Sequence, residues 1–108
     1  MPFDVTYHQY EPTREQIEQT EDLLLLEFGA DWCGHCQTLS PSLQALLEKY
    51  PQVQHLRIAD GRGKPLGRSF RVKLWPTLVL LRDGQVEDQL VRPSGQQVQQ
   101  ALQQLLSP

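Results

Sequence analysis

The sequence predicts an α/β domain built on a central mixed sheet of five strands, flanked by about four helices. Short apolar runs alternate along the chain with segments whose apolar residues recur every three or four positions. Such a β–α–β order favours parallel strands joined by right-handed crossovers. Asp83-Gly84 is a two-residue hairpin signal, which adds antiparallel strands to the sheet. Because the 108 residues contain no linker or internal repeat, we expect one domain over residues 1–108.

The first elements follow from short patterns. Residues 4–8 alternate loosely and predict a short edge strand. A helix is predicted to start at Pro12–Ile17, where a proline and an acid occupy the first turn. Residues 23–28 form an apolar run, typical of a strand that is covered on both faces.

A longer helix is predicted from Cys36 to the residue before Pro51. Pro41 lies inside this helix and should kink it, because proline has no N–H to donate to the preceding turn. The residues of its apolar face recur at helical spacing: Leu39, Leu43, Leu46, Leu47 and Tyr50.

The second half of the chain predicts three further strands and two helices. Residues 53–59 form a buried strand, and residues 65–71 a short helix. Residues 77–81 and 86–91 form the two strands of the hairpin. An amphipathic C-terminal helix is indicated by Val98, Ala101, Leu102, Leu105 and Leu106.

The charge is small and unevenly distributed. The net charge is −3, which gives no reason to expect a nucleic-acid partner. Nine of the thirteen acids lie in residues 1–50, whereas residues 57–73 form a basic region. This region is either an ordinary solvated surface or a docking patch for an acidic partner. Its basic residues are Arg57, Arg62, Lys64, Arg68, Arg71 and Lys73.

The sequence also bears on location. The N-terminus lacks the basic start and the long apolar stretch of a secretory signal. The longest apolar run, Leu23 to Leu26, is too short to span a bilayer. We therefore expect a cytoplasmic protein without membrane association.

The two cysteines, Cys33 and Cys36, require a chemical explanation. Two cysteines so close together cannot connect distant parts of a fold. They stand where a strand gives way to a helix, so Cys33 should have a lowered pKa at the helix N-terminus. Its thiolate would attack a disulfide in another molecule, and Cys36, one turn later, would release the reduced product.

Other roles for these cysteines fit less well. A zinc site usually needs four ligands, and His8, His35 and His55 lack the paired spacing that would complete one. Covalent haem attachment requires a histidine directly after the second cysteine, where this chain has Gln37. A pair of inert cysteines is the remaining alternative. We expect neither a metal nor an organic cofactor.

Residues 27–36, Glu-Phe-Gly-Ala-Asp-Trp-Cys-Gly-His-Cys, resemble the active-site segment of the thioredoxin superfamily. Pro41 matches the kink of the family's active-site helix, and Asp83-Gly84 its later hairpin. Trp75-Pro76-Thr77 matches the strand that the family opens with a cis proline. The resemblance covers roughly residues 4–106 and implies the thioredoxin fold.

The resemblance implies roles for individual residues. Cys33 would be the attacking thiol and Cys36 the resolving thiol, with a cis Pro76 against the two sulfurs. Substrate contacts would come from Trp32, Trp75, Pro76 and Arg92. Trp75 is bulkier than the usual residue and should reshape the substrate groove, while Arg92 stands near a glycine of typical thioredoxins. Both could also be neutral surface variations.

Glu27 and His35 are the remaining candidates for catalysis. Burial should raise the pKa of Glu27. In similar proteins an acid at this position exchanges protons with the resolving thiol, so the resemblance implies a general acid/base for Cys36; an outward-pointing surface acid is the alternative. The Gly34-His35 pair resembles protein disulfide isomerases rather than thioredoxins. An imidazole near Cys33 would stabilise the thiolate and make the disulfide more oxidising, unless His35 simply faces solvent.

The sequence thus predicts a monomeric thiol-disulfide oxidoreductase that reduces or exchanges disulfides in protein substrates. Its electrons would come from a thiol donor such as a reductase. The alternative is a thioredoxin-fold adaptor or chaperone-like module with little redox turnover, which would bind through the basic region.

Overall fold

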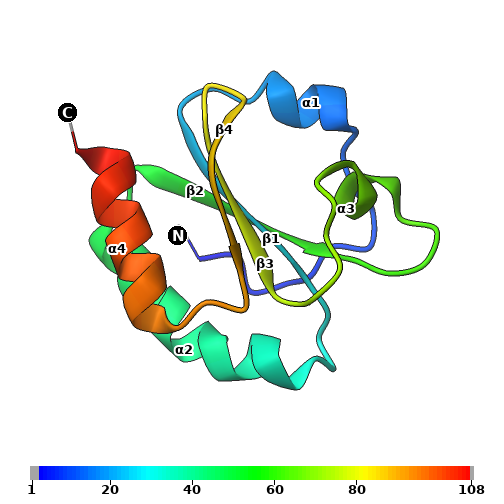
Figure 1. Ribbon diagram of the computed structural model, residues 1–108, viewed down its shortest axis with the longest axis horizontal. Coiled ribbons are helices and arrows are strands. Elements are labelled where there is room, and N and C mark those ends of the chain that lie inside the picture. The colour runs from blue at the N-terminus through cyan, green and yellow to red at the C-terminus, as the bar shows by residue number, and fades with distance from the viewer. Residues whose placement is uncertain (1–2, 108) are drawn as a thin grey trace.

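A computed structural model describes residues 3–107 of the chain and contains a mixed four-stranded sheet (Figure 1). The strands are β1 (Leu23–Gly29), β2 (Val53–Ala59), β3 (Thr77–Arg82) and β4 (Gln85–Val91). Their order across the sheet is β2-β1-β3-β4. Strand β1 pairs in parallel with β2 and antiparallel with β3, and β3 pairs antiparallel with β4. The expected mixture of parallel and antiparallel pairing is confirmed.

The expected fifth strand at residues 4–8 is wrong. Only one isolated bridge forms there, between His8 and Ile58 of β2. The carboxylate of Asp4 accepts a hydrogen bond from the Arg57 amide at 3.0 Å, and the Asp4 amide donates to His55 Nδ1 at 2.9 Å. Side chains therefore satisfy groups that a regular ladder would have paired, and the segment lies along β2 without becoming a strand.

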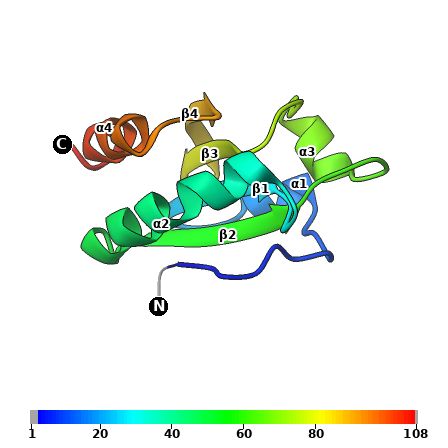
Figure 2. The ribbon, with the colours of Figure 1, turned by 90° about the horizontal axis from the view of Figure 1, so that it is seen from below.

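Within the described part of the chain, four helices cover the two faces of the sheet. They are α1 (Arg14–Glu18), α2 (Gly34–Lys49), α3 (Pro65–Ser69) and α4 (Gly95–Leu106). Helices α2 and α4 lie together, away from α1 and α3 (Figures 1 and 2). Capping boxes begin α1 at Thr13 and α4 at Ser94, which satisfies amide groups that a helix start leaves free.

Strand β1 lies at the centre of the core and is buried along its whole length. Alternate residues point to opposite faces, as the pleat requires. Leu23 and Leu25 pack toward α2 and α4, whereas Leu24, Leu26 and Phe28 pack toward α1 and α3. The carboxyl end of β1 leads through a short turn into α2, so a rigid strand holds the start of that helix.

The β3–β4 connection is the predicted hairpin. Asp83 has φ 51° and Gly84 has φ 81°, the left-handed backbone that a two-residue turn of this kind needs. A Cβ on Gly84 would lie 1.8 Å from the Glu18 carbonyl oxygen, so only glycine fits there.

Within residues 3–107, no helix combines the length and apolar character needed to cross a bilayer.

Candidate active site

The two cysteines sit at the start of α2, at the strand-to-helix transition that the sequence predicted. Cys33 is the N-cap residue, and the Cys36 amide donates a hydrogen bond to the Cys33 sulfur at 3.2 Å. Cys33 is 7% exposed and Cys36 1%. Burial, followed by the neighbouring Cys33, raises the pKa of the Cys36 thiol to about 12. Cys36 is therefore a protonated thiol at neutral pH, beneath a sulfur that lies closer to the surface.

Two tryptophans stand beside the cysteines. Trp32 is 74% exposed, and its ring makes a T-shaped contact with the Trp75 ring at a centroid distance of 5.4 Å. Trp75 packs against the cluster that contains both cysteines, and its indole N–H donates to Asp60 at 2.9 Å. The Trp75–Pro76 peptide bond is cis, as the resemblance implied.

A shallow groove of about 290 Å³ brings together His35, Pro76 and Arg92. Arg92 has φ 48°, a left-handed conformation that costs a residue with a side chain some energy. Its amide donates to the Pro76 carbonyl and its Nε to the Trp75 carbonyl, each at 2.9 Å. Arg92 therefore fixes the loop that carries Trp75 and Pro76 and adds positive charge to the groove.

Glu27 is fully buried and accepts three hydrogen bonds. His55 Nε2 lies 2.8 Å and Arg57 Nε 2.9 Å from Oε1, and the Tyr7 hydroxyl donates to Oε2 at 2.7 Å. Burial by itself would raise the pKa of Glu27, but the bond from His55, the charge of Arg57 and the Tyr7 hydroxyl together lower it. The expected rise in this pKa, and the outward-pointing alternative, are both wrong.

The sequence argument weighed Arg57 and His55 for other roles and missed that both bind Glu27. Arg57 is only 5% exposed, so it does not belong to the exposed surface of the basic region. It is the direct neighbour of Glu27 across the β1–β2 ladder. Because His55 Nδ1 accepts from the Asp4 amide, its Nε2 carries the proton that is shared with Glu27. The sequence signal that could have revealed this pair is a charged residue in each of two neighbouring buried strands, Glu27 in β1 and Arg57 in β2.

Tyr7 and Gly29 were also missed. Tyr7 is 5% exposed and lies in the same cluster as the cysteines. Gly29 ends β1 with no side chain, and the space above it is filled by Tyr7 and the Cys36 sulfur. Gly29 lies within the segment that resembles the family's active site, but the pattern assigned it no role.

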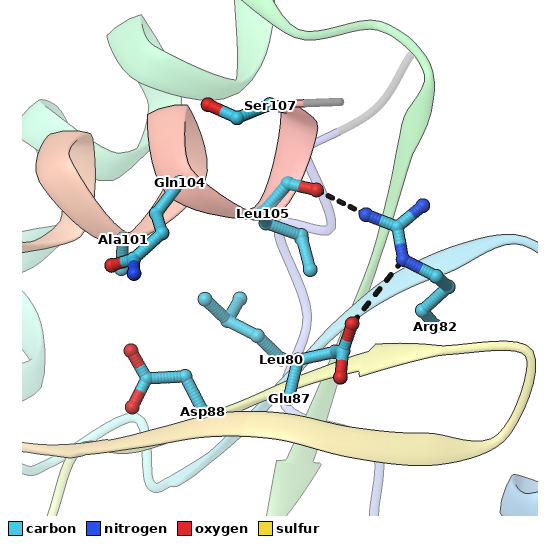
Figure 3. A pocket seen from close by; sticks show the side chains of 8 residues that line it. All are labelled: Leu80, Arg82, Glu87, Asp88, Ala101, Gln104, Leu105 and Ser107. Atoms are coloured by element: carbon cyan, nitrogen blue, oxygen red, sulfur yellow. Dashed lines mark hydrogen bonds and ion pairs between the residues drawn. The ribbon is translucent and has the colours of Figure 1, made fainter.

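A larger hollow than this groove lies elsewhere, between the β3–β4 hairpin and α4 (Figure 3). It has a volume of about 770 Å³, and an ion pair between Arg82 and Glu87 closes one side at 3.3 Å. Neither Cys33 nor Cys36 lines this hollow, so it lies apart from the cysteine pair at the start of α2.

Comparisons with known proteins agree with this site. The family model described as Thioredoxin matches residues 4–107. The structure of thioredoxin 2 from Pseudomonas aeruginosa PAO1 in its reduced form is 44% identical, with a TM-score of 0.85, over 95% of this chain and 96% of that one. A Thioredoxin H-type of Ricinus communis is 30% identical over 88% of this chain and 83% of its own length. A mutant thioredoxin from Halobacterium salinarum NRC-1 is 26% identical, with a TM-score of 0.77, over 94% of this chain and 90% of that one.

Proposed function

We propose that this chain, which belongs to the thioredoxin family of thiol-disulfide oxidoreductases, acts on protein disulfides with Cys33 as nucleophile and Cys36 as resolving thiol. The observation that carries this assignment is the difference between the two sulfurs. Cys33 caps α2 and accepts a hydrogen bond from an amide, whereas the Cys36 thiol is buried and held protonated.

The reaction then has two steps. The Cys33 thiolate attacks one sulfur of the substrate disulfide, forms a mixed disulfide and expels the other sulfur as a thiolate. Cys36 loses its proton and attacks the Cys33 sulfur, which forms the Cys33–Cys36 disulfide and expels the second substrate thiolate. Each expelled thiolate takes up a proton, and two electrons pass to the substrate. A thiol donor such as a reductase would restore the dithiol.

The substrate would bind across the rim of the site, which we define as Trp32, His35, Trp75 and Arg92. These side chains are exposed or half-buried around the cysteines. Pro76 follows Trp75 in the chain and lines the groove, where a bound segment of a partner protein would meet it. Arg92 adds a fixed positive charge, so we expect a preference for substrates with an acidic residue near the disulfide.

The direction of exchange depends on His35, which is exposed at the groove beside Cys33. Thioredoxin has a reduction potential of about −270 mV and protein disulfide isomerase about −180 mV. At about 30 mV per 1.4 kcal/mol, the gap is worth about 4 kcal/mol. We propose a monomer that works in the cytoplasm, where a reducing thiol pool would supply its electrons.

Trapping experiments test the assignment of the two cysteines. A Cys36→Ser variant should accumulate a mixed disulfide with a disulfide-bonded protein substrate, visible as a shift in mass that added dithiothreitol reverses. A Cys33→Ser variant should form no such adduct and show no turnover. If Cys33→Ser kept full biological activity, a binding role without redox turnover would replace the proposal.

A further inference from the structure

The proposed resolving step requires Cys36 to lose a proton inside the protein, and the buried side chains around it define a route. Glu27 is the buried acid that lies nearest to the cysteines in the sequence, but its Oε1 is occupied by His55 and Arg57. Only Oε2 remains, and it accepts from the Tyr7 hydroxyl at 2.7 Å. Tyr7 is therefore the side chain that links the accessible oxygen of Glu27 to the surroundings of Cys36.

Gly29 brings Tyr7 and Cys36 together. A Cβ placed on Gly29 would lie 2.6 Å from the Cys36 sulfur, 3.0 Å from Cε1 of Tyr7 and 3.1 Å from its hydroxyl oxygen. The tyrosine ring and the thiol therefore both lie against the backbone of Gly29, which has no side chain to separate them. Any side chain on Gly29 would occupy the space in which they meet.

The geometry points to Tyr7 as a proton relay between the Cys36 thiol and the Glu27 carboxylate, a role that rests on the proposed resolving function of Cys36. Because its hydroxyl donates to Glu27, the lone pairs of the oxygen are free to accept the S–H proton of Cys36. Three separate parts of the chain supply the relay: the N-terminal segment, β1 and α2.

The step balances within the resolving reaction. As Cys36 attacks the Cys33 sulfur of the mixed disulfide, its S–H proton moves to the Tyr7 oxygen, and the Tyr7 proton moves to Glu27 Oε2. The bond between Cys33 and the substrate sulfur breaks, and the departing thiolate carries the electron pair. The proton on Glu27 Oε2 then passes to solvent, from which the expelled substrate thiolate takes up a proton, and Glu27 returns to its carboxylate form.

The charged and titratable groups around Tyr7 favour a hydroxyl that passes a proton on over a tyrosinate that acts as a base. The guanidinium of Arg57 lies 4.6 Å from the Tyr7 ring centre, and His55 bonds to the other oxygen of Glu27. Cys33 lies beyond Cys36. Burial, together with the nearby Glu27 charge, raises the pKa of Tyr7 far above its ordinary value. The hydroxyl therefore stays protonated and can pass a proton on without becoming a tyrosinate.

Stopped-flow oxidation of the reduced protein by dithiobis(nitrobenzoic acid) separates the two steps, because each attack releases one coloured thiolate. A Tyr7→Phe variant keeps the ring and removes only the hydroxyl. We expect its first phase, the Cys33 attack, to be unchanged. Its second phase should slow about tenfold at neutral pH, with a pH profile displaced to higher pH.

Matched variants make this test specific. Tyr10→Phe removes the hydroxyl of a tyrosine that is 87% exposed, and both of its phases should match the wild type. Glu27→Gln should slow the second phase as Tyr7→Phe does, and the double variant should be no slower than either one. A second phase unmoved by Tyr7→Phe in rate and pH profile would overturn the relay. Loss of the first phase in the wild type would instead overturn the proposed function.

Discussion

Around the cysteines the rim is open and its side chains are exposed or half-buried, whereas four polar side chains in the interior are buried and joined by hydrogen bonds to one of them, Glu27. We call the second group the buried network; its members are Tyr7, Glu27, His55 and Arg57. In the rim, positions are set by local backbone, such as the left-handed conformation of Arg92. In the buried network, each position depends on a partner from another segment. The rim therefore suits the recognition of varied substrates, and the network suits the control of one proton.

The largest expected effect follows from breaking the buried network at Arg57. An Arg57→Met variant leaves the Glu27 carboxylate buried without its charged partner. Removing one partner of a buried pair typically costs about 3–5 kcal/mol of unfolding free energy. Urea unfolding at neutral pH measures this loss. Arg62→Met, in an exposed loop of the basic region, is the matched control and should change stability by less than about 0.5 kcal/mol.

The pH dependence of the same variant sharpens the comparison. In the wild type, folding lowers the pKa of Glu27 below its value of about 4.3 in the unfolded chain. The ionised Glu27 therefore stabilises the fold above that pH, and this stabilisation is lost as the pH falls through the pKa of the folded state. Without Arg57, burial should dominate and raise this pKa. The variant should therefore gain stability as pH falls from about 7 toward 5. Parallel stability curves for the two proteins would contradict this account.

A smaller effect is expected from closing the space above Gly29. The methyl group of Gly29→Ala would stand 2.6 Å from the Cys36 sulfur and displace it from Tyr7. Overpacking of this kind costs about 1–3 kcal/mol, and the resolving phase should slow as well. Gly34→Ala, where nothing lies within 4 Å of the added Cβ, should be neutral or slightly stabilising. Equal stabilities of the two variants would mean that the site at Gly29 is not tightly packed.

The smallest effect is expected at the rim. Arg92→Gly relieves a left-handed backbone at φ 48° but removes the bond to the Trp75 carbonyl, so stability should change by less than about 1 kcal/mol. The value of kcat/KM should fall about threefold for a peptide disulfide with an adjacent glutamate. A matched peptide with glutamine should be unaffected. An equal fall for both peptides would show that Arg92 shapes the groove without selecting charge.

The position of the cysteine pair was predictable from the sequence, whereas most of the buried network was not. Cys33, His35 and Cys36 are close along the chain, and a strand that leads into a helix places them without further information. Tyr7 and Arg57 come from other segments and meet Glu27 only through packing and the β1–β2 register. Glu27 itself was found as an acid in an apolar strand, but the direction of its pKa depended on partners that the pattern did not reveal.

The strands also show which features a sequence pattern can predict and which depend on tertiary contacts. The bounds of β1 and β2 were predicted within a residue, β1 from its apolar run and β2 from apolar residues that alternate with polar ones. The segment at residues 4–8 has a strand-like alternation, yet the side chains of Asp4 and His55 satisfy the backbone groups that a ladder would use. Side-chain competition for backbone hydrogen bonds is a tertiary effect, and alternation alone does not encode it.

The most direct test of the whole account is the equilibrium reduction potential of the Cys33–Cys36 pair, titrated in glutathione buffers and read by thiol alkylation and mass. We predict one reversible two-electron couple between about −270 and −180 mV, with a value near the upper limit if His35 stabilises the Cys33 thiolate. The absence of any reversible couple, with both cysteines alkylated equally at every glutathione ratio, would contradict the account.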